Sequence, residues 1–262
     1  MKLSICIVNY YSERELGRFL ESIAVYRPEH LFEVIVVDNS QSGIQSLKAE
    51  FGDWLHIIDS FKNVGYGQAL NRAVKKAKGE YVFLCNPDLE AQDGSFQKLL
   101  HFADRTGEFG IIGPKLLFVE GGIQDSCRRF PNCWDLMIKR LGLSRWFPGR
   151  MEQYLMKHKK PDEQAEVDWL VGAALLMKRD TFQALRGFDE RFFLFFEDTD
   201  LCRRCWEKQL SVMYYPDATF LHTRQRLSES AWPGFWIFKK VFWIHLISAG
   251  KYFWKWRKRS SE

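Results

Sequence analysis

The stretch Tyr81-Val82-Phe83-Leu84-Cys85-Asn86-Pro87-Asp88 decides the fold. Its apolar run between Gly79 and Pro87 is typical of a strand buried in the centre of a sheet. Pro87 lacks a backbone N–H and disfavours a helical conformation at Asn86, so the strand is expected to end there. Asp88 would then lie at the carboxyl end of a central strand, where open α/β sheets bind ligands. A carboxylate at that place suits a divalent cation or a ribose hydroxyl, and an ordinary Asn-Pro-Asp turn is the alternative interpretation.

Apolar strands alternate with helical patterns on both sides of this stretch. The order strand, helix, strand, helix, strand over the first 58 residues predicts a parallel sheet with right-handed crossovers. Residues 120–165 read as loops and short helices. The predicted strands cover 3–8, 34–37, 55–58, 81–85, 167–177 as one apolar strand, and 212–215 ended by Pro216, and a helix is predicted over 198–208.

Length and composition limit the kinds of protein that the chain can form. At 262 residues with 46% hydrophobic residues, the chain is expected to form one large domain with a substantial core. The first residues read directly as a strand rather than as a signal peptide, and six scattered cysteines favour a reducing, cytosolic setting. Cys202 and Cys205 have CxxC spacing, but core thiols are a better interpretation than a zinc site because the pair lacks the context of a zinc knuckle.

Three predicted strands end in polar residues that would line up along one edge of the sheet. These are Asn9, Asp38 and Asp88. Asp38 could accept a hydrogen bond from a ribose hydroxyl or a base N–H, and a turn-forming Asp-Asn-Ser is an equally good interpretation. The turn at 65–67, Gly-Tyr-Gly, could bring backbone amides to a phosphate. Because position 70 is Leu, the dinucleotide fingerprint fails, and a P-loop is absent as well.

A second group of polar residues follows the aromatic segment 192–196. Glu197, Asp198 and Asp200 place three carboxylates within four residues, which is unfavourable unless something uses them. Acidic residues at the start of a helix, stabilised by its dipole, are the structural alternative. A carboxylate at a helix N-terminus stays ionised, as a general base for a sugar hydroxyl must.

These segments together resemble family 2 glycosyltransferases, in order, over about residues 3–222. The closest subgroup resembles bacterial rhamnosyltransferases of O-antigen and cell-wall polysaccharide assembly. The matching segments are 8–10, 36–40, 63–67 with Asn71, 86–88, 172–174, 187–190 and 197–201 with Arg203. The resemblance implies a GT-A fold over residues 1–225: an α/β, Rossmann-like, mostly parallel central sheet flanked by helices. It also implies an inverting mechanism, a nucleotide-sugar donor, and Mg²⁺ or Mn²⁺.

By position, the resemblance also assigns roles to single residues. Asp198 matches the catalytic base, with Glu197 and Asp200 as the fallback candidates, and Asp88 matches the metal-binding carboxylate. His222 matches a histidine that often joins the metal, while an ordinary surface or core histidine is the competing interpretation. The residues expected on the donor side are Asn9, Asp38, Gly65, Asn71 and Asn86. Because Asn86-Pro87-Asp88 stands where the family has Asp-x-Asp, one metal ligand lacks a charge, and a weaker affinity for the metal is expected.

The C-terminal residues 226–262 are predicted to form a separate aromatic and basic helical tail. From Trp232 to Ser261 there is no acidic residue, while seven are Lys or Arg. Phe242, Leu246, Phe253 and Trp256 are predicted to share one helical face. The apolar runs are too short to span a bilayer, so an interfacial helix on the cytoplasmic face of the membrane is expected, with packing on the core as the alternative. A nucleic-acid partner is not expected.

The resulting prediction is an inverting glycosyltransferase that moves L-rhamnose from dTDP-L-rhamnose. Its acceptor would be a lipid-linked glycan, carried on a polyprenyl diphosphate, or a polysaccharide. A UDP-hexose-dependent enzyme of the same fold and a non-catalytic module that binds sugar nucleotides are the alternatives. A nicotinamide oxidoreductase is a further rival, although the absence of the dinucleotide fingerprint counts against it.

Overall fold

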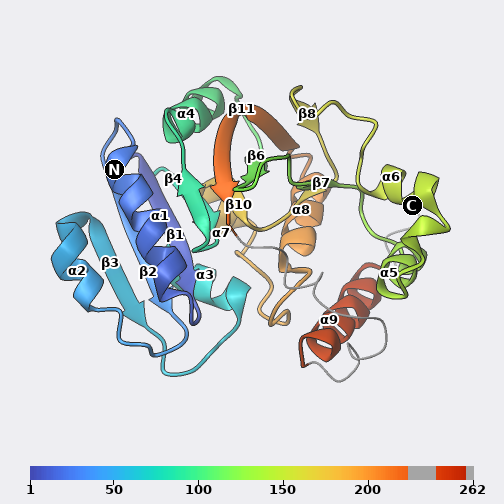
Figure 1. Cartoon of the computed structure of the whole chain (residues 1–262), viewed down its shortest axis with the longest axis horizontal. Coiled ribbons are helices and arrows are strands. Elements are labelled where there is room, and N and C mark those ends of the chain that lie inside the picture. The colour runs from blue at the N-terminus through green and yellow to red at the C-terminus, as the bar shows by residue number, and fades with distance from the viewer. Residues whose placement is uncertain (224–239, 258–262) are drawn as a thin grey trace.

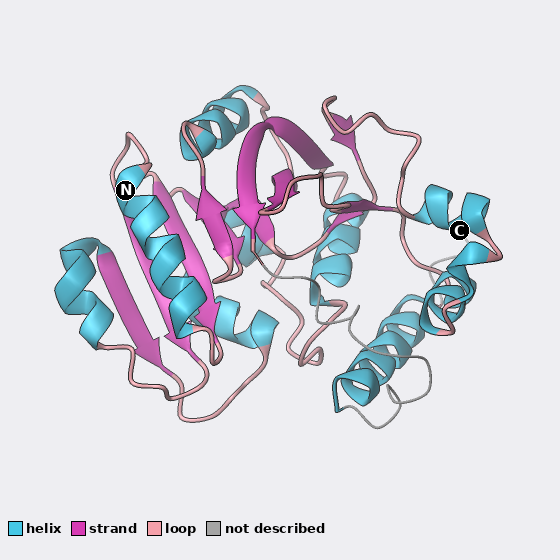
Figure 2. Cartoon of the chain, in the orientation of Figure 1, coloured by secondary structure: helices cyan, strands magenta, loops and turns pink. Residues whose placement is uncertain are grey.

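The computed structural model describes residues 1–223 and 240–257, which form one mixed sheet with helices on both faces (Figures 1 and 2). The sheet order is β3-β2-β1-β4-β10-β6-β11-β5, and β8 adds to β11. Strands of the main sheet are β1 (Leu3–Asn9), β2 (Phe32–Asp38), β3 (Leu55–Asp59), β4 (Tyr81–Cys85), β5 (Leu89–Ala91), β6 (Ile111–Phe118), β8 (Ala165–Glu166), β10 (Ala174–Lys178) and β11 (Val212–His222). A small second sheet pairs β7 (Cys127–Arg128) with β9 (Trp169–Leu170).

Two apolar clusters cover the two faces of the main sheet. Alternate residues of β1 point to opposite faces, so Ile5 and Ile7 join one cluster while Cys6 and Val8 join the other. Helices α1 and α4 pack on the first face, and α3, α7 and α8 pack on the second. The helices are α1 (Glu13–Val25), α2 (Ser46–Phe51), α3 (Tyr66–Lys76), α4 (Ser95–Arg105), α5 (Cys133–Arg140), α6 (Pro148–Tyr154), α7 (Arg179–Ala184), α8 (Glu197–Glu207) and α9 (Lys240–Trp256), with 3-10 turns η1 (Gly52–Trp54) and η2 (Leu143–Arg145).

The predicted parallel core of the sheet is confirmed. β2 and β4 pair in parallel with β1, and β3 pairs in parallel with β2. β10 then runs antiparallel to β4 and β6, and β5 runs antiparallel to β11, so the sheet is mixed and mostly parallel.

The single strand predicted over 167–177 is wrong. The chain forms β9, leaves the ladder at Gly172-Ala173, and enters the main sheet as β10. The break follows from packing against α8, because the backbone N–H of Gly172 donates to the Asp198 carboxylate at 2.8 Å. A Cβ at Gly172 would lie 3.1 Å from the Cβ of Asp198, so only glycine fits there without a shift.

The predicted strand end at Pro216 is also wrong. β11 continues to His222, and its register against β6 shifts between Tyr215 and Thr219. Pro216 lies within this irregularity, where no ladder hydrogen bond is required of it. The longer strand carries His222 to the same edge as Leu89, its partner on β5.

Helix α9 packs on the loop at 192–196 through a face that shares Trp256 and Phe253, but not Leu246, with the predicted one. Ser248, Ala249, Tyr252 and Trp256 are its buried residues, whereas Leu246, predicted on the apolar face, is exposed. Among the described residues, no helix combines the length and apolarity needed to cross a bilayer. The predicted boundary at 225–226 and the tail residues 226–239 and 258–262 lie outside the described residues, so the division into two domains stays a prediction.

A fully buried carboxylate joins α9 to α8. The Trp256 indole N–H donates to Asp200 Oδ1 at 3.0 Å, and Lys255 Nζ lies 2.6 Å from the same oxygen. Arg204, one turn further along α8, pairs with Oδ2 at 2.8 Å. Two cations and an indole therefore compensate a charge that burial alone would make costly.

Replacing the buried indole should therefore destabilise the whole domain. For Trp256→Ala we expect the free energy of unfolding to fall by about 3 kcal/mol or more, as for other buried large-to-small changes. Denaturant unfolding measures it. Trp254→Ala, on the exposed side of the same helix, is the matched control and should change stability by less than about 0.5 kcal/mol. Equal effects of the two substitutions would contradict the observed packing of α9.

Candidate active site

The paired ends of β1 and β2 bring Asn9 and Asp38 together. Their Cα atoms are register partners, and both side chains are fully buried. Asn9 Nδ2 donates to Asp38 Oδ1 at 3.1 Å. Ser40 and Ser42 donate to the Asp38 carboxylate from both backbone N–H and hydroxyl groups. The predicted meeting of two strand ends is observed.

Hydrogen bonds keep the Asp38 carboxylate ionised. Burial raises the pKa of Asp38, but the donors on Ser40, Asn9 and Ser42 outweigh burial and hold the pKa below its ordinary value. An ionised carboxylate at this edge can accept from a base N–H or a ribose hydroxyl. It does so with a fixed geometry, because its neighbours lock it in place.

Asp88 and His222 meet at the end of β4 and β11. His222 Nε2 lies 3.2 Å from Asp88 Oδ1, and both side chains are buried. On its other side, His222 Nδ1 lies 2.6 Å from Oε1 of the buried Gln124. With the amide oriented as in the structure, Gln124 accepts the Nδ1 proton and leaves Nε2 facing the carboxylate.

This pair fits a divalent cation. In neutral imidazole, Nε2 and Asp88 Oδ1 both present electron pairs to the same point, and the Gln124 contact is the kind that orients a metal-binding histidine. An imidazolium would instead form an ion pair with Asp88. Among the described residues, no group of three or more His, Cys, Asp or Glu side chains is placed so that it could hold a metal ion. A metal here would therefore complete its shell with water and donor phosphates, as Mg²⁺ commonly does.

Gly65, predicted to approach a phosphate, packs against the loop that precedes α8. Its φ is +89°, and a Cβ there would overlap the carbonyl oxygen of Phe193. The N–H of Tyr66 donates to that same oxygen at 3.0 Å. The Gly65 turn thus fixes the position of the aromatic loop, residues 192–196. The role of Gly65 toward a donor stays a prediction.

Asn71 and Asn86, both predicted on the donor side, make backbone contacts. The Asn71 amide exchanges two hydrogen bonds with the backbone of Phe188, at 2.9 and 2.8 Å. The N–H of Asn86 donates to the carbonyl of Ala173 at 3.0 Å. Asn71 therefore ties α3 to the loop at 188, and direct contact of either side chain with a donor stays a prediction.

Asp198 lies in the first turn of α8 with its side chain partly exposed. Its Oδ2 accepts from the N–H of Gly172, and its Oδ1 accepts from the N–H of Thr199 at 2.7 Å. Burial raises the pKa of Asp198, and the donors on Gly172 and Thr199 oppose that rise. A carboxyl with a raised pKa is a stronger base once ionised, which suits proton abstraction near neutral pH.

Glu197 has different surroundings from Asp198. It is buried, and its Oε2 has no hydrogen-bond partner. Burial, reinforced by the charge of Asp198, raises the pKa of Glu197 well above its ordinary value. Two adjacent carboxyl groups with different surroundings are suited to different acid–base roles. The hydrogen-bonded, partly exposed Asp198 is the better candidate for the base.

Tyr66 connects the two groups of carboxylates. Its hydroxyl donates to the carbonyl of Gly172 at 2.7 Å. Burial raises the pKa of Tyr66 well above its ordinary value, and the charges of Glu197, Asp198 and Asp88 act in the same direction. Tyr66 therefore contacts, at Gly172, the same turn whose N–H donates to Asp198.

Two residues of this site, Gln124 and Arg128, were missed by the sequence reasoning. The guanidinium of Arg128 is buried between the rings of Tyr154 and Trp169, at 5.5 and 5.6 Å, and its Nη1 has no partner. Its charge lowers the pKa of Asp198. Both residues come from the irregular segment 120–165, where no periodicity marks them.

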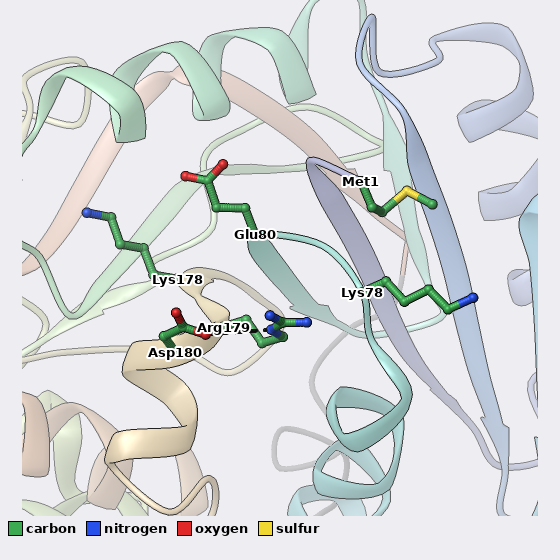
Figure 3. A pocket seen from close by; sticks show the side chains of 6 residues that line it. All are labelled: Met1, Lys78, Glu80, Lys178, Arg179 and Asp180. Atoms are coloured by element: carbon green, nitrogen blue, oxygen red, sulfur yellow. Dashed lines mark ion pairs between the residues drawn. The ribbon is translucent and has the colours of Figure 1, made fainter.

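A hollow of about 370 Å³ lies at the edge of the sheet opposite to Asp38 and Asp88 (Figure 3). It is lined by residues at the amino ends of β1 and β4 and at the start of α7, including Lys78, Glu80 and Asp180. Arg179 and Asp180 face one another there at 3.7 Å. This hollow is separated from Asp38 and Asp88 by the length of the strands and is not part of the site.

The fold is that of GT-A proteins. GalNAc-T7, solved with UDP, GalNAc and Mn²⁺, superposes with a TM-score of 0.66 at 15% identity over 89% of this chain and 45% of that one. A mannosyltransferase of Pyrobaculum calidifontis, solved with GDP-mannose and Mn²⁺, gives a TM-score of 0.57 at 17% identity, over 86% of this chain and 58% of that one. This chain thus spans less than two thirds of these two solved chains.

Residues 4–149 match the family described as Glycosyl transferase family 2, and residues 152–226 match the N-terminal domain of galactosyltransferase. The N-acetylglucosaminyl-diphospho-decaprenol L-rhamnosyltransferase of Mycobacterium tuberculosis is 30% identical, over 84% of this chain and 75% of the relative. The rhamnosyltransferase WbbL of Escherichia coli K12 is 26% identical, over 95% of this chain and 91% of the relative. The chain belongs to glycosyltransferase family 2 and is related to rhamnosyltransferases of cell-wall and O-antigen synthesis. Membership of this family excludes the rival function, that of a nicotinamide oxidoreductase.

The Asp88–His222 pair leads to a prediction about metal binding. Nucleoside diphosphate should bind the wild-type protein more tightly with Mn²⁺ than with EDTA, because the cation links the phosphates to the protein. We expect His222→Ala to remove most of this difference, and Gln124→Leu to weaken Mn²⁺ binding by about tenfold or more through loss of the orienting contact. Titration calorimetry measures both effects.

The exposed His101 on α4 provides the matched control, since His101→Ala removes an imidazole far from the site. It should bind like the wild type. Equal affinities in Mn²⁺ and EDTA for the wild type would overturn the metal role of His222 and Asp88.

Proposed function

We propose that the protein is an inverting glycosyltransferase that transfers L-rhamnose from dTDP-L-rhamnose to a hydroxyl of a polyprenyl-diphosphate-linked glycan. The observation that carries the proposal is the placement of Asp198. Its carboxylate is held by the N–H groups of Gly172 and Thr199. The residue after Gly172, Ala173, accepts at its carbonyl from the N–H of Asn86, two residues before Asp88. The turn at 172–173 thus contacts both the proposed base and the segment proposed to hold the donor diphosphate.

In the proposed reaction the acceptor oxygen attacks the anomeric carbon while the bond from that carbon to the diphosphate oxygen breaks. Asp198 takes the proton of the attacking hydroxyl, and the diphosphate leaves with the electron pair. A single displacement of this kind inverts the anomeric configuration. Because Gly172 and Thr199 leave the Asp198 carboxylate little freedom to turn, the base is positioned before the acceptor arrives.

Two groups of residues, each at the end of strands, are proposed to bind the nucleotide-sugar donor. Asp38, with Asn9 behind it, would accept from the nucleoside, and Asp88 with His222 would hold Mg²⁺ or Mn²⁺. When bound, that cation neutralises the charge of the leaving diphosphate. Asn86, Gly65 and Asn71 are the other residues proposed for the donor side.

The choice of donor and acceptor rests on the relatives. The mycobacterial relative is named for L-rhamnosyl transfer to N-acetylglucosaminyl-diphospho-decaprenol, and a relative from Shigella flexneri is named a dTDP-rhamnosyl transferase. A UDP-hexose donor is the second candidate, since the superposed S. aureus TarS was solved with UDP-GlcNAc. We further propose that the enzyme works on the cytoplasmic face of the membrane, where residues 226–262 help it to associate, and that residues 1–225 form the catalytic domain.

Asp198→Asn should keep the donor site and lose the base. We expect transfer to fall by about 100-fold or more, the usual contribution of a general base, with the affinity for the nucleotide sugar unchanged. Asp180→Asn, exposed at the far edge of the sheet, is the matched control and should transfer normally. If Asp198→Asn turns over normally while Glu197→Gln is inactive, the base is Glu197.

The pH dependence gives a second check on the same residue. Because the pKa of Asp198 is raised and the base acts ionised, transfer should fall, as pH is lowered, at a higher pH than an ordinary carboxylate would require. Arg128 lowers this pKa, so Arg128→Met should move the acid limb of kcat/KM to still higher pH. An unmoved limb would show that another group titrates.

The donor is tested by competition. With dTDP-L-rhamnose and UDP-hexoses present together, product analysis by mass spectrometry should show transfer of the deoxyhexose. Hexose transfer from the UDP-sugar would replace the proposed donor by the alternative. Hydrolysis or transfer of neither donor, with intact binding, would favour the non-catalytic module.

A further inference from the structure

Large exposed apolar side chains gather on the segment that runs from α5 through η2 to α6. Trp134 and Met137 project from α5, and Leu141, Trp146 and Phe147 follow it. The two indoles are 65% and 79% exposed, values at which burial would gain a large hydrophobic free energy. Between these residues lies an apolar hollow of about 320 Å³ whose walls include Ile138 and Leu143.

A second set of exposed apolar side chains lies on the outer face of α9. It consists of Trp243, Leu246, Ile247 and Trp254, all at least half exposed. The inner face of the same helix is buried against the loop at 192–196. The helix is thus apolar on both sides, although only its inner side has a partner among the described residues.

These two sets lie on adjacent elements. Leu136 of α5 packs on the cluster that contains Tyr252 and Trp256 of α9, and the Arg140 guanidinium lies over the ring of Phe242 at 5.3 Å. In Figure 1, α5, α6 and α9 occupy the same end of the molecule, away from β2 and β3. We call the exposed apolar residues of 134–147 and of the outer face of α9 the docking surface.

The charges around the docking surface are mainly positive. In the stretch 133–150 the only acidic residue is Asp135, which is buried and paired with Arg150 at 2.7 Å. Arg145 is exposed there, and α9 contains no acidic residue while Lys240 and Lys251 are exposed on it. Glu152, near the end of α6, is an exposed acid beyond this stretch. Indoles with an excess of basic residues complement an interface of apolar chains and anionic headgroups.

We propose that the docking surface seats the enzyme on a bilayer that contains anionic lipid, with α5, η2 and α6 taking part together with α9. The inference rests on the proposed lipid-linked acceptor, whose carrier remains in the membrane. It also differs from the expectation of a C-terminal membrane tail, since half of the surface comes from residues 134–147. The hollow beside Ile138 would receive part of a hydrocarbon chain.

The experiment measures co-sedimentation of the full-length protein with vesicles of phosphatidylcholine alone or with added phosphatidylglycerol. We expect binding only with the anionic lipid, weakened and not abolished by high salt, because salt screens the charges but leaves the apolar contribution. Trp134→Ser/Trp146→Ser should lower the partition constant by about tenfold or more, and Trp243→Ser/Trp254→Ser should do the same, because each variant loses two interfacial indoles.

The control is Val25→Ser/Leu31→Ser, which removes apolar side chains that are 71% and 76% exposed at the other end of the molecule. It should bind vesicles like the wild type, and thermal melts should show that all variants fold. If only the α9 variant loses binding, the composite surface is wrong. Absence of vesicle binding by the wild type also overturns the proposal. So does a wild-type dimer that dissociates in the indole variants, since the surface would then be an interface between two copies of the chain.

Transfer to a water-soluble, short-chain diphosphate acceptor separates this inference from the proposed function. Such transfer without vesicle binding would retain the function and reject the docking surface. Vesicle binding without transfer to any diphosphate-linked acceptor would retain the surface and reject the acceptor.

Discussion

Two consecutive phenylalanines hold a backbone conformation on which the site depends. Phe195 and Phe196 have φ of +69° and +68°, the left-handed region, which costs a bulky residue about 1–3 kcal/mol. Helix α9 supplies the compensating contacts: Tyr252 packs on Phe196 with ring centroids 5.3 Å apart, and the Ser248 hydroxyl donates to the carbonyl of Leu194 at 2.9 Å. Because α8 begins directly after this pair, the direction in which Asp198 projects depends on α9 being docked.

Close backbone contacts also explain how distant segments meet at Asp198. The aromatic loop passes close to Gly65, and the turn between β9 and β10 passes close to Asp198 at Gly172. In both places a backbone group donates to a fixed acceptor, which replaces water and satisfies a buried polar group. The site is therefore an assembly of backbone contacts that hold a few side chains, which is consistent with a geometry set before substrate binds.

The sequence predicted the parts of the site that depend on single strands. Asp38 and Asp88 each follow an apolar run that a polar or proline residue ends, and parallel pairing then brings such ends together. Contacts between unrelated segments could not be predicted. The break at Gly172 depends on α8, the passage of β11 through Pro216 depends on a shifted register with β6, and Gln124 reaches His222 from 98 residues away. Each of these is decided by tertiary packing that no local periodicity records.

Helix α9 shows why its inner and outer faces have to be considered together. Tyr252 and Trp256 are buried, so the helix cannot leave the core to insert into a bilayer without giving up the contacts that hold Phe196. Docking through its outer face would therefore occur with α9 in place, as part of a rigid body that includes α8. If the proposed docking occurs, such a body would fix the distance between the bilayer and Asp198, and it would favour acceptors whose hydroxyl lies at that height above the lipid. A buried inner face with an exposed aromatic outer face is thus a means by which the fold could select a membrane-bound acceptor, independently of contacts with its sugar.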